Sequence, residues 1–264
     1  MSDGVVLYDK PPGVTSAAAV AELRRTFARG GKVGHAGTLD PFATGLLLLL
    51  VGRATRAQRF LMALPKTYEV TARFGAVSST GDPEGEIVET GAVPVGELSL
   101  PTGVVRQRPP AFSAVKLGGR RAYAIARAGI DVQLAEREVE VYRFEERARE
   151  ADRRRFVIEC SSGTYVRSLI AALGDAYCEQ LRRTRIGPFA VGDADPQRVL
   201  SLERALAFMP EVRLSGEQAR RAGHGAPVVG RADGVVRLTD GNGLIALAEP
   251  RADADLLKPI VGFR

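Results

Sequence analysis

One aspartate of this chain stands where a carboxylate could act on a bound substrate. Asp40 lies between Leu39 and Pro41, and the proline restricts the backbone of Asp40 toward an extended conformation. Residues 30–45 around it are rich in glycine, and an apolar run, residues 46–51, follows directly. A carboxylate presented from a glycine-rich loop against a buried element is a typical nucleophile or base. The alternative is an Asp-Pro pair that only begins a turn.

Other residue types that do chemistry are scarce. The chain has two histidines, His35 and His224, and two cysteines, Cys160 and Cys178, without a C-x-x-C pattern. This supply argues against a histidine-based metal cluster or a redox centre. We therefore expect neither a metal nor a redox cofactor. His35 belongs to the glycine-rich loop, where it could donate to a phosphate or hold the loop together.

The charge of the chain is moderately basic. Lys and Arg number 37 against 31 Asp and Glu, a net charge of +6, and only five of the cations are Lys. Arginine can bind phosphate with two parallel hydrogen bonds and can stack on bases, but a codon bias would give the same composition. Residues 211–264 carry eight cations and seven anions. Most of the excess charge, and the expected site, therefore lie before residue 210.

Length and composition indicate a soluble protein. The chain has 264 residues, 45% hydrophobic and 26% charged, which suits one large domain or a medium domain with a small one. The N-terminal residues are charged too early for a signal peptide. The longest apolar run, 46–51, is far shorter than the roughly 20 residues of a membrane span. We expect a cytoplasmic protein that does not bind membranes.

Short segments with distinct patterns predict the elements that position these residues. Residues 66–74 alternate strictly between apolar and polar side chains, which predicts a half-buried strand. Further strands are predicted at 5–8, 139–147 and 155–160, and helices at 16–27, 121–128 and 164–176. Residues 30–45 are predicted to be an irregular loop, and 46–51 a buried strand or a helix turn.

Strands and helices mix without regular alternation, which favours the α+β class. After Met209-Pro210 the chain changes to short apolar pieces broken by Gly, Asp and Asn, a rhythm typical of a small β-barrel or sandwich. This change predicts two domains, residues 1–209 and residues 210–264.

Six segments resemble, in order, the motifs of one enzyme family. They are 9–16 (DKPPGVTS), 34–45 (GHAGTLDPFATG), 66–70 (KTYEV), 80–85 (TGDPEG), 108–116 (RPPAFSAVK) and 160–167 (CSSGTYVR). Over residues 5–192 the chain resembles the TruB family of bacterial pseudouridine synthases, which act on the tRNA T loop. Residues 212–263 resemble, more weakly, the PUA-like RNA-binding barrel often appended to these enzymes. The resemblance implies a catalytic domain built on a mixed or antiparallel sheet, followed by an all-β PUA-like domain.

The resemblance also assigns the central catalytic roles. The family breaks the glycosidic bond of a uridine, rotates the base and rejoins it through C5, without a cofactor. Asp40 matches the family's catalytic carboxylate, the nucleophile or base. Arg167 matches the arginine that pairs with it, and such a pair would keep the carboxylate ionised in a pocket poor in water. Tyr68 matches the aromatic that stacks on the flipped base, and Tyr165 a second pocket tyrosine.

Further residues are matched with weaker roles. His35 corresponds to a residue that inserts where the base has left the stack, and Asp82 to an aspartate that positions a loop. Leu181 matches a pocket leucine, but this chain is shorter than its relatives just before it, which leaves the placement of Leu181 open. Lys10 and Lys116 could meet phosphates. The cluster Arg182-Arg183-Thr184-Arg185 could follow the RNA backbone.

Each of these residues also has a plainer interpretation. Arg167 could be a surface cation, Tyr68 a core residue and Asp82 a turn residue. Lys10 and Lys116 could be solvated surface lysines.

The sequence thus predicts an enzyme that converts uridine 55 of the tRNA T loop to pseudouridine. We expect tRNA as the partner, with a monomeric enzyme and no obligate protein partner. Two alternatives are a relative that works with a guide RNA, and a non-catalytic tRNA-binding or folding factor on the same scaffold.

We expect residues 210–264 to bind tRNA away from the T loop. The alternative is that they only stabilise the main domain.

Overall fold

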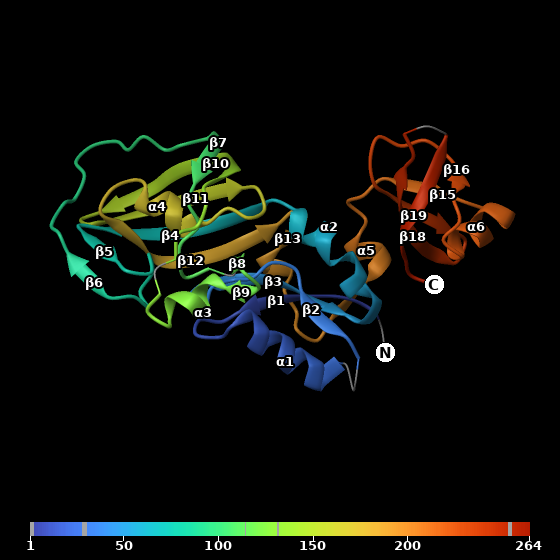
Figure 1. Ribbon diagram of the computed structural model, residues 1–264, viewed down its shortest axis with the longest axis horizontal. Coiled ribbons are helices and arrows are strands. Elements are labelled where there is room, and N and C mark those ends of the chain that lie inside the picture. Colours follow the sequence, from blue (N-terminus) through green and yellow to red (C-terminus); the bar gives the residue numbers. More distant parts are fainter. Residues whose placement is uncertain (1–2, 28–30, 114, 131, 253–254) are drawn as a thin grey trace.

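The computed structural model describes residues 3–27, 31–113, 115–130, 132–252 and 255–264. The molecule is elongated, with a broad sheet at one end and a small β-rich unit, residues 211–264, at the other (Figure 1).

A ten-stranded mixed sheet forms the larger part. Its strands follow in the order β14 (Val199–Ser201), β1 (Gly4–Lys10), β3 (Thr44–Val51), β12 (Ala176–Ile186), β4 (Lys66–Phe74), β11 (Arg153–Cys160), β10 (Arg137–Glu150) and β7 (Gly103–Gln107). Two short strands pair beside this path, β2 (Val33–His35) with β3 and β13 (Phe189–Ala190) with β12. Strands β12 and β3 run parallel, and the other pairs are antiparallel. The predicted α+β class with a mixed sheet is confirmed.

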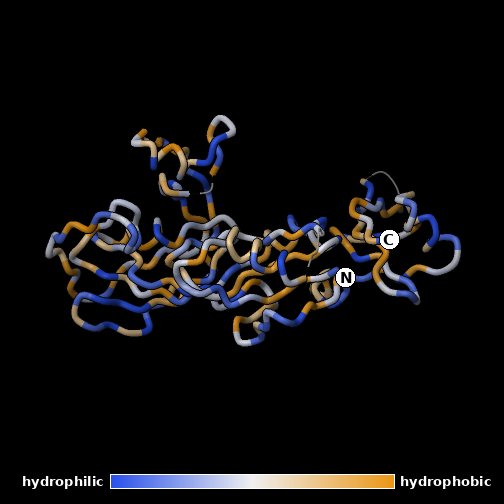
Figure 2. Tube along the Cα trace, turned by 90° about the horizontal axis from the view of Figure 1, so that it is seen from below, coloured by the Kyte–Doolittle hydropathy of each residue, from blue (hydrophilic) through white to orange (hydrophobic). Residues whose placement is uncertain are grey.

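Short helices and hairpins surround this sheet. They are α1 (Ser16–Phe27), η1 (Gly52–Ala57), α2 (Gln58–Ala63), α3 (Ala122–Ala126), α4 (Val166–Ala171), η2 (Val191–Asp193) and α5 (Leu202–Ala205), with the hairpins β5 (Ala76–Ser78)–β6 (Ile87–Glu89) and β8 (Lys116–Leu117)–β9 (Arg120–Arg121). A lobe stands out from the long face of the molecule in Figure 2, at the position where Figure 1 draws β8, β9 and α3. None of the helices in the described part of the chain combines the length and the apolar composition needed to cross a membrane.

The C-terminal unit is a five-stranded sheet with one helix. Its strands follow in the order β15 (Glu211–Arg213), β17 (Val236–Asp240), β18 (Gly243–Pro250), β19 (Leu256–Gly262) and β16 (Val228–Val229), and the helix is α6 (Gly216–Gly223). The predicted rhythm of short strands is therefore found here, whereas α6 was not anticipated. Its sequence contains two arginines and two glycines, so the apolar spacing of a helix is hard to recognise.

The apolar run 46–51 forms strand β3 and is buried along its whole length. Leu46, Leu48 and Leu50 pack into one hydrophobic cluster, and Leu47 and Leu49 into another on the opposite face. Because both faces of the strand are covered, its sequence lacks the alternation that would have distinguished it from a helix.

Three predicted boundaries change in the structure. The helix predicted at 164–176 is α4, which ends at Ala171, because Gly174 takes a φ of +135° and residues from Ala176 onward pair with β4. The helix predicted at 121–128 is the shorter α3. The loop predicted at 30–45 contains β2, held extended by its pairing with β3. Residue 30, where that loop was predicted to begin, lies outside the described residues.

The two parts of the molecule share a hydrophobic cluster. Leu247 and Phe263 of the C-terminal unit pack with Leu61 and Leu206 of the larger part. The carbonyl of Phe263 also accepts a hydrogen bond from the Arg53 guanidinium. Because apolar contact continues across the boundary, the C-terminal unit contributes to the core of the larger part.

Candidate active site

Asp40 is presented by the turn between β2 and β3, and a buried lysine holds that turn. The Nζ of Lys10 donates to the carbonyls of Pro11 and Val14, both at 2.8 Å, and of Pro41 at 3.1 Å. Lys10 is completely buried, and burial lowers its pKa to about 8, with Asp40 opposing the shift. Lys10 is therefore neither the phosphate contact nor the solvated surface lysine that we expected. Its place on the buried strand β1 turns it inward.

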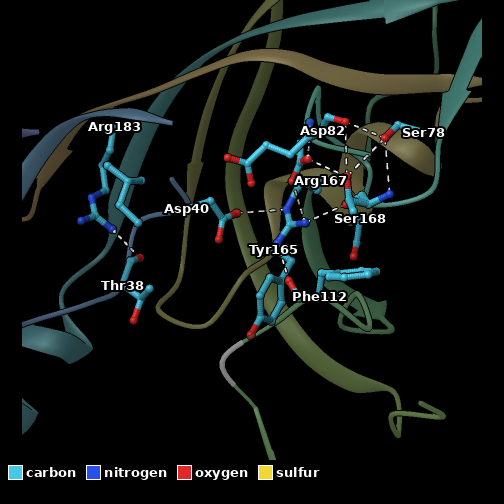
Figure 3. Close-up of polar contacts among 12 residues, drawn as sticks. Thr38, Asp40, Ser78, Asp82, Phe112, Tyr165, Arg167, Ser168 and Arg183 are labelled. Atoms are coloured by element: carbon cyan, nitrogen blue, oxygen red, sulfur yellow. Dashed lines mark hydrogen bonds and ion pairs between the residues drawn. The ribbon is translucent and has the colours of Figure 1, made fainter. Parts of the chain in front are cut away.

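Arg183 holds the same turn from the other side. It is buried on β12 and donates to the carbonyls of Leu46 at 2.7 Å, Gly37 at 3.2 Å and Thr38 at 3.3 Å, the last drawn in Figure 3. Side chains alternate along a strand, so Arg183 shares the inward face of Leu181.

The predicted RNA-backbone cluster is therefore divided by the strand. Arg182 forms an ion pair with Asp9 at 2.7 Å, Arg183 is buried against backbone carbonyls, and Arg185 is exposed. Arg183 cannot follow an RNA backbone as we expected, because it is buried and donates to backbone carbonyls of the chain.

Asp40, Arg167 and Asp82 form one ion-paired group (Figure 3). The Nε of Arg167 lies 3.0 Å from Asp40 Oδ2, and its Nη1 lies 2.9 Å from Asp82 Oδ2. The guanidinium also donates to the carbonyls of Thr80 at 2.7 Å and Phe112 at 2.8 Å. Arg167 is 4% exposed, so it is not a surface cation.

Asp82 serves the turn and the ion pair together. Its Oδ1 accepts from the Thr80 hydroxyl at 2.6 Å and from the Glu84 N–H at 3.0 Å. Its other carboxylate oxygen binds Arg167. The turn that Asp82 organises thus presents a buried carboxylate to Arg167. Asp82 is therefore both a turn residue and a residue that positions its loop.

Burial dominates the electrostatics of Asp40. Its pKa is raised because the carboxyl group lies deep among protein atoms, even though 31% of its side-chain surface still meets solvent. Arg167 and Arg183 oppose this rise, and the negative charge of Asp82 adds to it. The pair with Arg167 thus limits the cost of ionising Asp40 without removing it. Because folding raises this pKa, the ionised carboxylate lowers the stability of the fold at pH values above the ordinary pKa of an aspartate.

A buried apolar cluster adjoins this group. Tyr68 on β4 and Leu181 on β12 belong to one buried cluster with Leu39, next to Asp40 in the chain. Leu181 stands opposite Val70 in the β12–β4 register, so the shortened segment before it still delivers it to the cluster. Tyr68 is 8% exposed, and burial raises the pKa of its phenol.

Tyr165 lies beside the ion-paired group, whereas His35 lies near Arg183. Tyr165 directly precedes α4, and Figure 3 shows its ring below Arg167. His35 ends β2, and its Nδ1 is buried without a hydrogen-bond partner. Burial lowers the His35 pKa, and Arg183 and Arg121 lower it further. A neutral imidazole binds phosphate weakly, so His35 is better suited to contact a base than a phosphate. Lys116 is exposed on β8. This position agrees with a phosphate contact and with a solvated surface lysine alike.

Sequence reasoning missed the two internal supports of the turn, Lys10 as a carbonyl anchor and Arg183 as its counterpart. In the structure burial follows a period of two from Leu181 to Arg183, but residues 182–185 are all polar in the sequence, so no apolar alternation predicted the inward position of Arg183. The bulge between Arg183 and Arg185 interrupts that period. For Lys10 no sequence signal exists, because carbonyl groups are the same in every residue.

The chain is similar to known proteins in sequence and in fold. Residues 24–166 match the model of the TruB family pseudouridylate synthase N-terminal domain. A tRNA pseudouridine synthase B of Thermobifida fusca is 41% identical, over 100% of this chain and 99% of its own. Its counterpart in Aromatoleum aromaticum is 45% identical, over 73% of this chain and 66% of its own.

Among solved structures, a Cbf5-Nop10-Gar1 complex contains a chain 27% identical to this one, with a TM-score of 0.68 over 93% of this chain and 78% of that chain. An H/ACA RNP bound to a substrate RNA aligns with a TM-score of 0.70 at 23% identity, over 99% of this chain and 85% of that chain, a likeness of fold. The family match covers more than half of the chain, and the Thermobifida fusca relative aligns over its full length. The chain therefore belongs to the TruB family of pseudouridylate synthases.

Proposed function

We propose that this chain isomerises uridine 55 in the T loop of tRNA to pseudouridine. The observation that carries the proposal is the ion-paired Asp40–Arg167 group beside the Tyr68 cluster, in a chain whose full-length relatives are tRNA pseudouridine synthases. The reaction breaks the N1–C1′ bond, joins C5 to C1′, removes the C5 proton and protonates N1.

Each side chain of the group has a part in this reaction. Asp40 is the nucleophile or base, and Arg167 keeps its carboxylate charged and oriented against the cost of burial. Asp82 keeps Arg167 in place. Tyr68 and Leu181 form the apolar wall on which the flipped base stacks.

The remaining residues act around the base. Tyr165 borders the base pocket, and His35, held neutral by its lowered pKa, inserts where the base leaves the T loop. Lys116, exposed on β8, contacts the RNA backbone.

The chain also has a proposed organisation. Residues 1–209 form the catalytic domain and residues 210–264 a PUA-like domain. The enzyme acts in the cytoplasm as a monomer without an obligate protein partner or cofactor.

A guide-dependent reaction is the main alternative, because one structural neighbour comes from a complex with two further proteins. The relatives named as tRNA enzymes are considerably more similar, at 41% identity against 27%. A non-catalytic RNA-binding factor is disfavoured because Asp40, Arg167 and Tyr68 are all present and assembled.

Tritium release tests the proposal directly. The purified chain is incubated with a guide-free tRNA transcript that carries C5-tritiated uridine, and released tritium is counted. We expect release of the label at one uridine per tRNA, and none from a transcript with cytidine at position 55. No release from either transcript would refute the proposal, and release from the cytidine transcript would refute the assignment to position 55.

A further inference from the structure

Two facing residues on neighbouring strands contact the segment that leads into α4. Gln107 on β7 and Arg137 on β10 are direct partners in the antiparallel register. The Oε1 of Gln107 accepts the Tyr165 N–H at 2.7 Å, and Arg137 donates to the carbonyl of Gly163. The Arg137 guanidinium carbon lies 4.8 Å from the centre of the Tyr165 ring, within the range of a cation–π contact.

The helix that follows depends on such outside support. Helix α4 has only six residues and no side-chain hydrogen bond at its N-terminal cap, Tyr165. A helix this short does not hold its shape alone. Arg167 lies in its first turn, so the position of Arg167 follows from the position of Tyr165.

Neither Gln107 nor Arg137 has all of its hydrogen-bond donors paired. The Nε2 of Gln107 and the Nε of Arg137 are buried without a hydrogen-bond partner. An unpaired buried donor costs stability, and such groups are rare in folded proteins.

We propose that Gln107 and Arg137 are positioning residues, which set the place of the Tyr165 ring and, through the first turn of α4, the guanidinium of Arg167. Gln107 fixes the backbone of Tyr165, and Arg137 fixes its ring. This inference rests on the proposed function, since it concerns the orientation of groups in that reaction.

The segment after Gln107 supports the same helix at two more points. The Ser168 hydroxyl donates to the Arg108 carbonyl at 2.9 Å, and Arg167 donates to the Phe112 carbonyl at 2.8 Å. The chain from Gln107 to Phe112 therefore follows α4 from its cap into its first turn. Gln107 is the first of these contacts and the one nearest the pocket tyrosine.

The first test compares Arg137→Met with the control Arg106→Met in the full-length chain. Arg106 lies on the same strand as Gln107, with 73% of its side chain exposed. We expect Arg137→Met to lower the single-turnover rate on tRNA transcript about 10- to 100-fold, the scale for a misplaced catalytic group. The tRNA dissociation constant and the rate of Arg106→Met should stay near wild type. A wild-type rate for Arg137→Met would overturn the proposal, as would a loss confined to tRNA binding.

The second test asks whether Arg137 acts through Tyr165. In a Tyr165→Leu background the ring is gone, so adding Arg137→Met should cost less than about twofold more. Fully multiplying losses would show that Arg137 acts elsewhere and would overturn the proposal.

The third test uses rescue. Gln107→Leu removes the acceptor for the Tyr165 N–H, whereas Gln107→Glu keeps an acceptor beside Arg137 and should restore most of the rate. Equal losses in the two variants would contradict the role given to Gln107.

If Arg137→Met fails to fold, Arg137→Lys repeats the first test, because lysine keeps the charge without the flat stacking face. Wild-type enzyme is assayed in parallel, so an inactive wild type would refute the proposed function instead.

Discussion

Arg167 lies 3.0 Å from the carboxylate of Asp40, yet its position does not depend on Asp40. Its other contacts are the Asp82 carboxylate and the carbonyls of Thr80 and Phe112. Other partners thus hold the guanidinium beside the Asp40 carboxylate, which is the arrangement that electrostatic preorganisation requires.

We expect Asp40→Asn to abolish turnover without weakening the fold. The amide is nearly the same shape but is neither nucleophile nor base, Arg167 keeps its other partners, and the cost of an ionised buried carboxylate is removed. Tritium release should fall by at least about 1,000-fold, with a melting temperature no lower than wild type and similar tRNA affinity. Activity within about tenfold of wild type would contradict the role given to Asp40.

Asp82→Asn should move the acid limb of the pH profile to lower pH. The active form of Asp40 is the carboxylate, so kcat/KM is lost as the pH falls through the pKa of Asp40, which burial raises. The charge of Asp82 raises that pKa further, and its removal lowers it. The rate at neutral pH should also fall, because Arg167 loses an ion pair.

The control for this profile is Glu86→Gln, at an exposed position on the same loop, which should leave the acid limb in place. An acid limb unmoved by Asp82→Asn would show that another group controls it.

Tyr68→Leu separates stacking from core packing when it is compared with Tyr177→Leu. Both tyrosines are buried, but only Tyr68 belongs to the cluster beside Asp40. Loss of a stacking ring is worth about 1–3 kcal/mol, so turnover by Tyr68→Leu should fall at least about fivefold. Tyr177→Leu should lower the melting temperature and keep its turnover. A Tyr68→Leu enzyme that turns over normally but melts early would make Tyr68 a core residue alone.

Lys10→Met should destabilise the whole fold. It leaves three carbonyls near Asp40 without their shared donor, and we expect the free energy of unfolding to fall by about 2–4 kcal/mol in urea titrations. Lys116→Met, at an exposed position, should change it by less than about 0.5 kcal/mol. Equal midpoints for the two variants would show that the anchor of the Asp40 turn is dispensable.

Removal of residues 210–264 should lower the stability of the larger part and, as a result, its activity on every substrate. Truncation at Met209 would expose the cluster that Leu247 and Phe263 now cover, so the packing favours the stabilising role over a grip on tRNA alone. We expect a lower melting temperature and equal losses of activity on full-length tRNA and on a T-arm stem-loop. A loss confined to full-length tRNA, with an unchanged melting temperature, would instead restore the grip role.

The sequence by itself determined the family, the proposed catalytic carboxylate and the strand that carries Tyr68. These rest on local signals, namely a twelve-residue motif around Asp40 and strict alternation at 66–74, which the burial of β4 follows residue by residue. Local signals survive folding because they describe neighbours in the chain.

Only the tertiary structure decided how the charged side chains are used. Lys10 and Arg183 looked like RNA contacts, but strands β1 and β12 turn them inward against backbone carbonyls. The grip of Gln107 and Arg137 on Tyr165 likewise depends on the register of β7 with β10. Burial decides whether a cation meets solvent or a carbonyl, and burial follows from which strands pair, an outcome of the whole chain that no short pattern records.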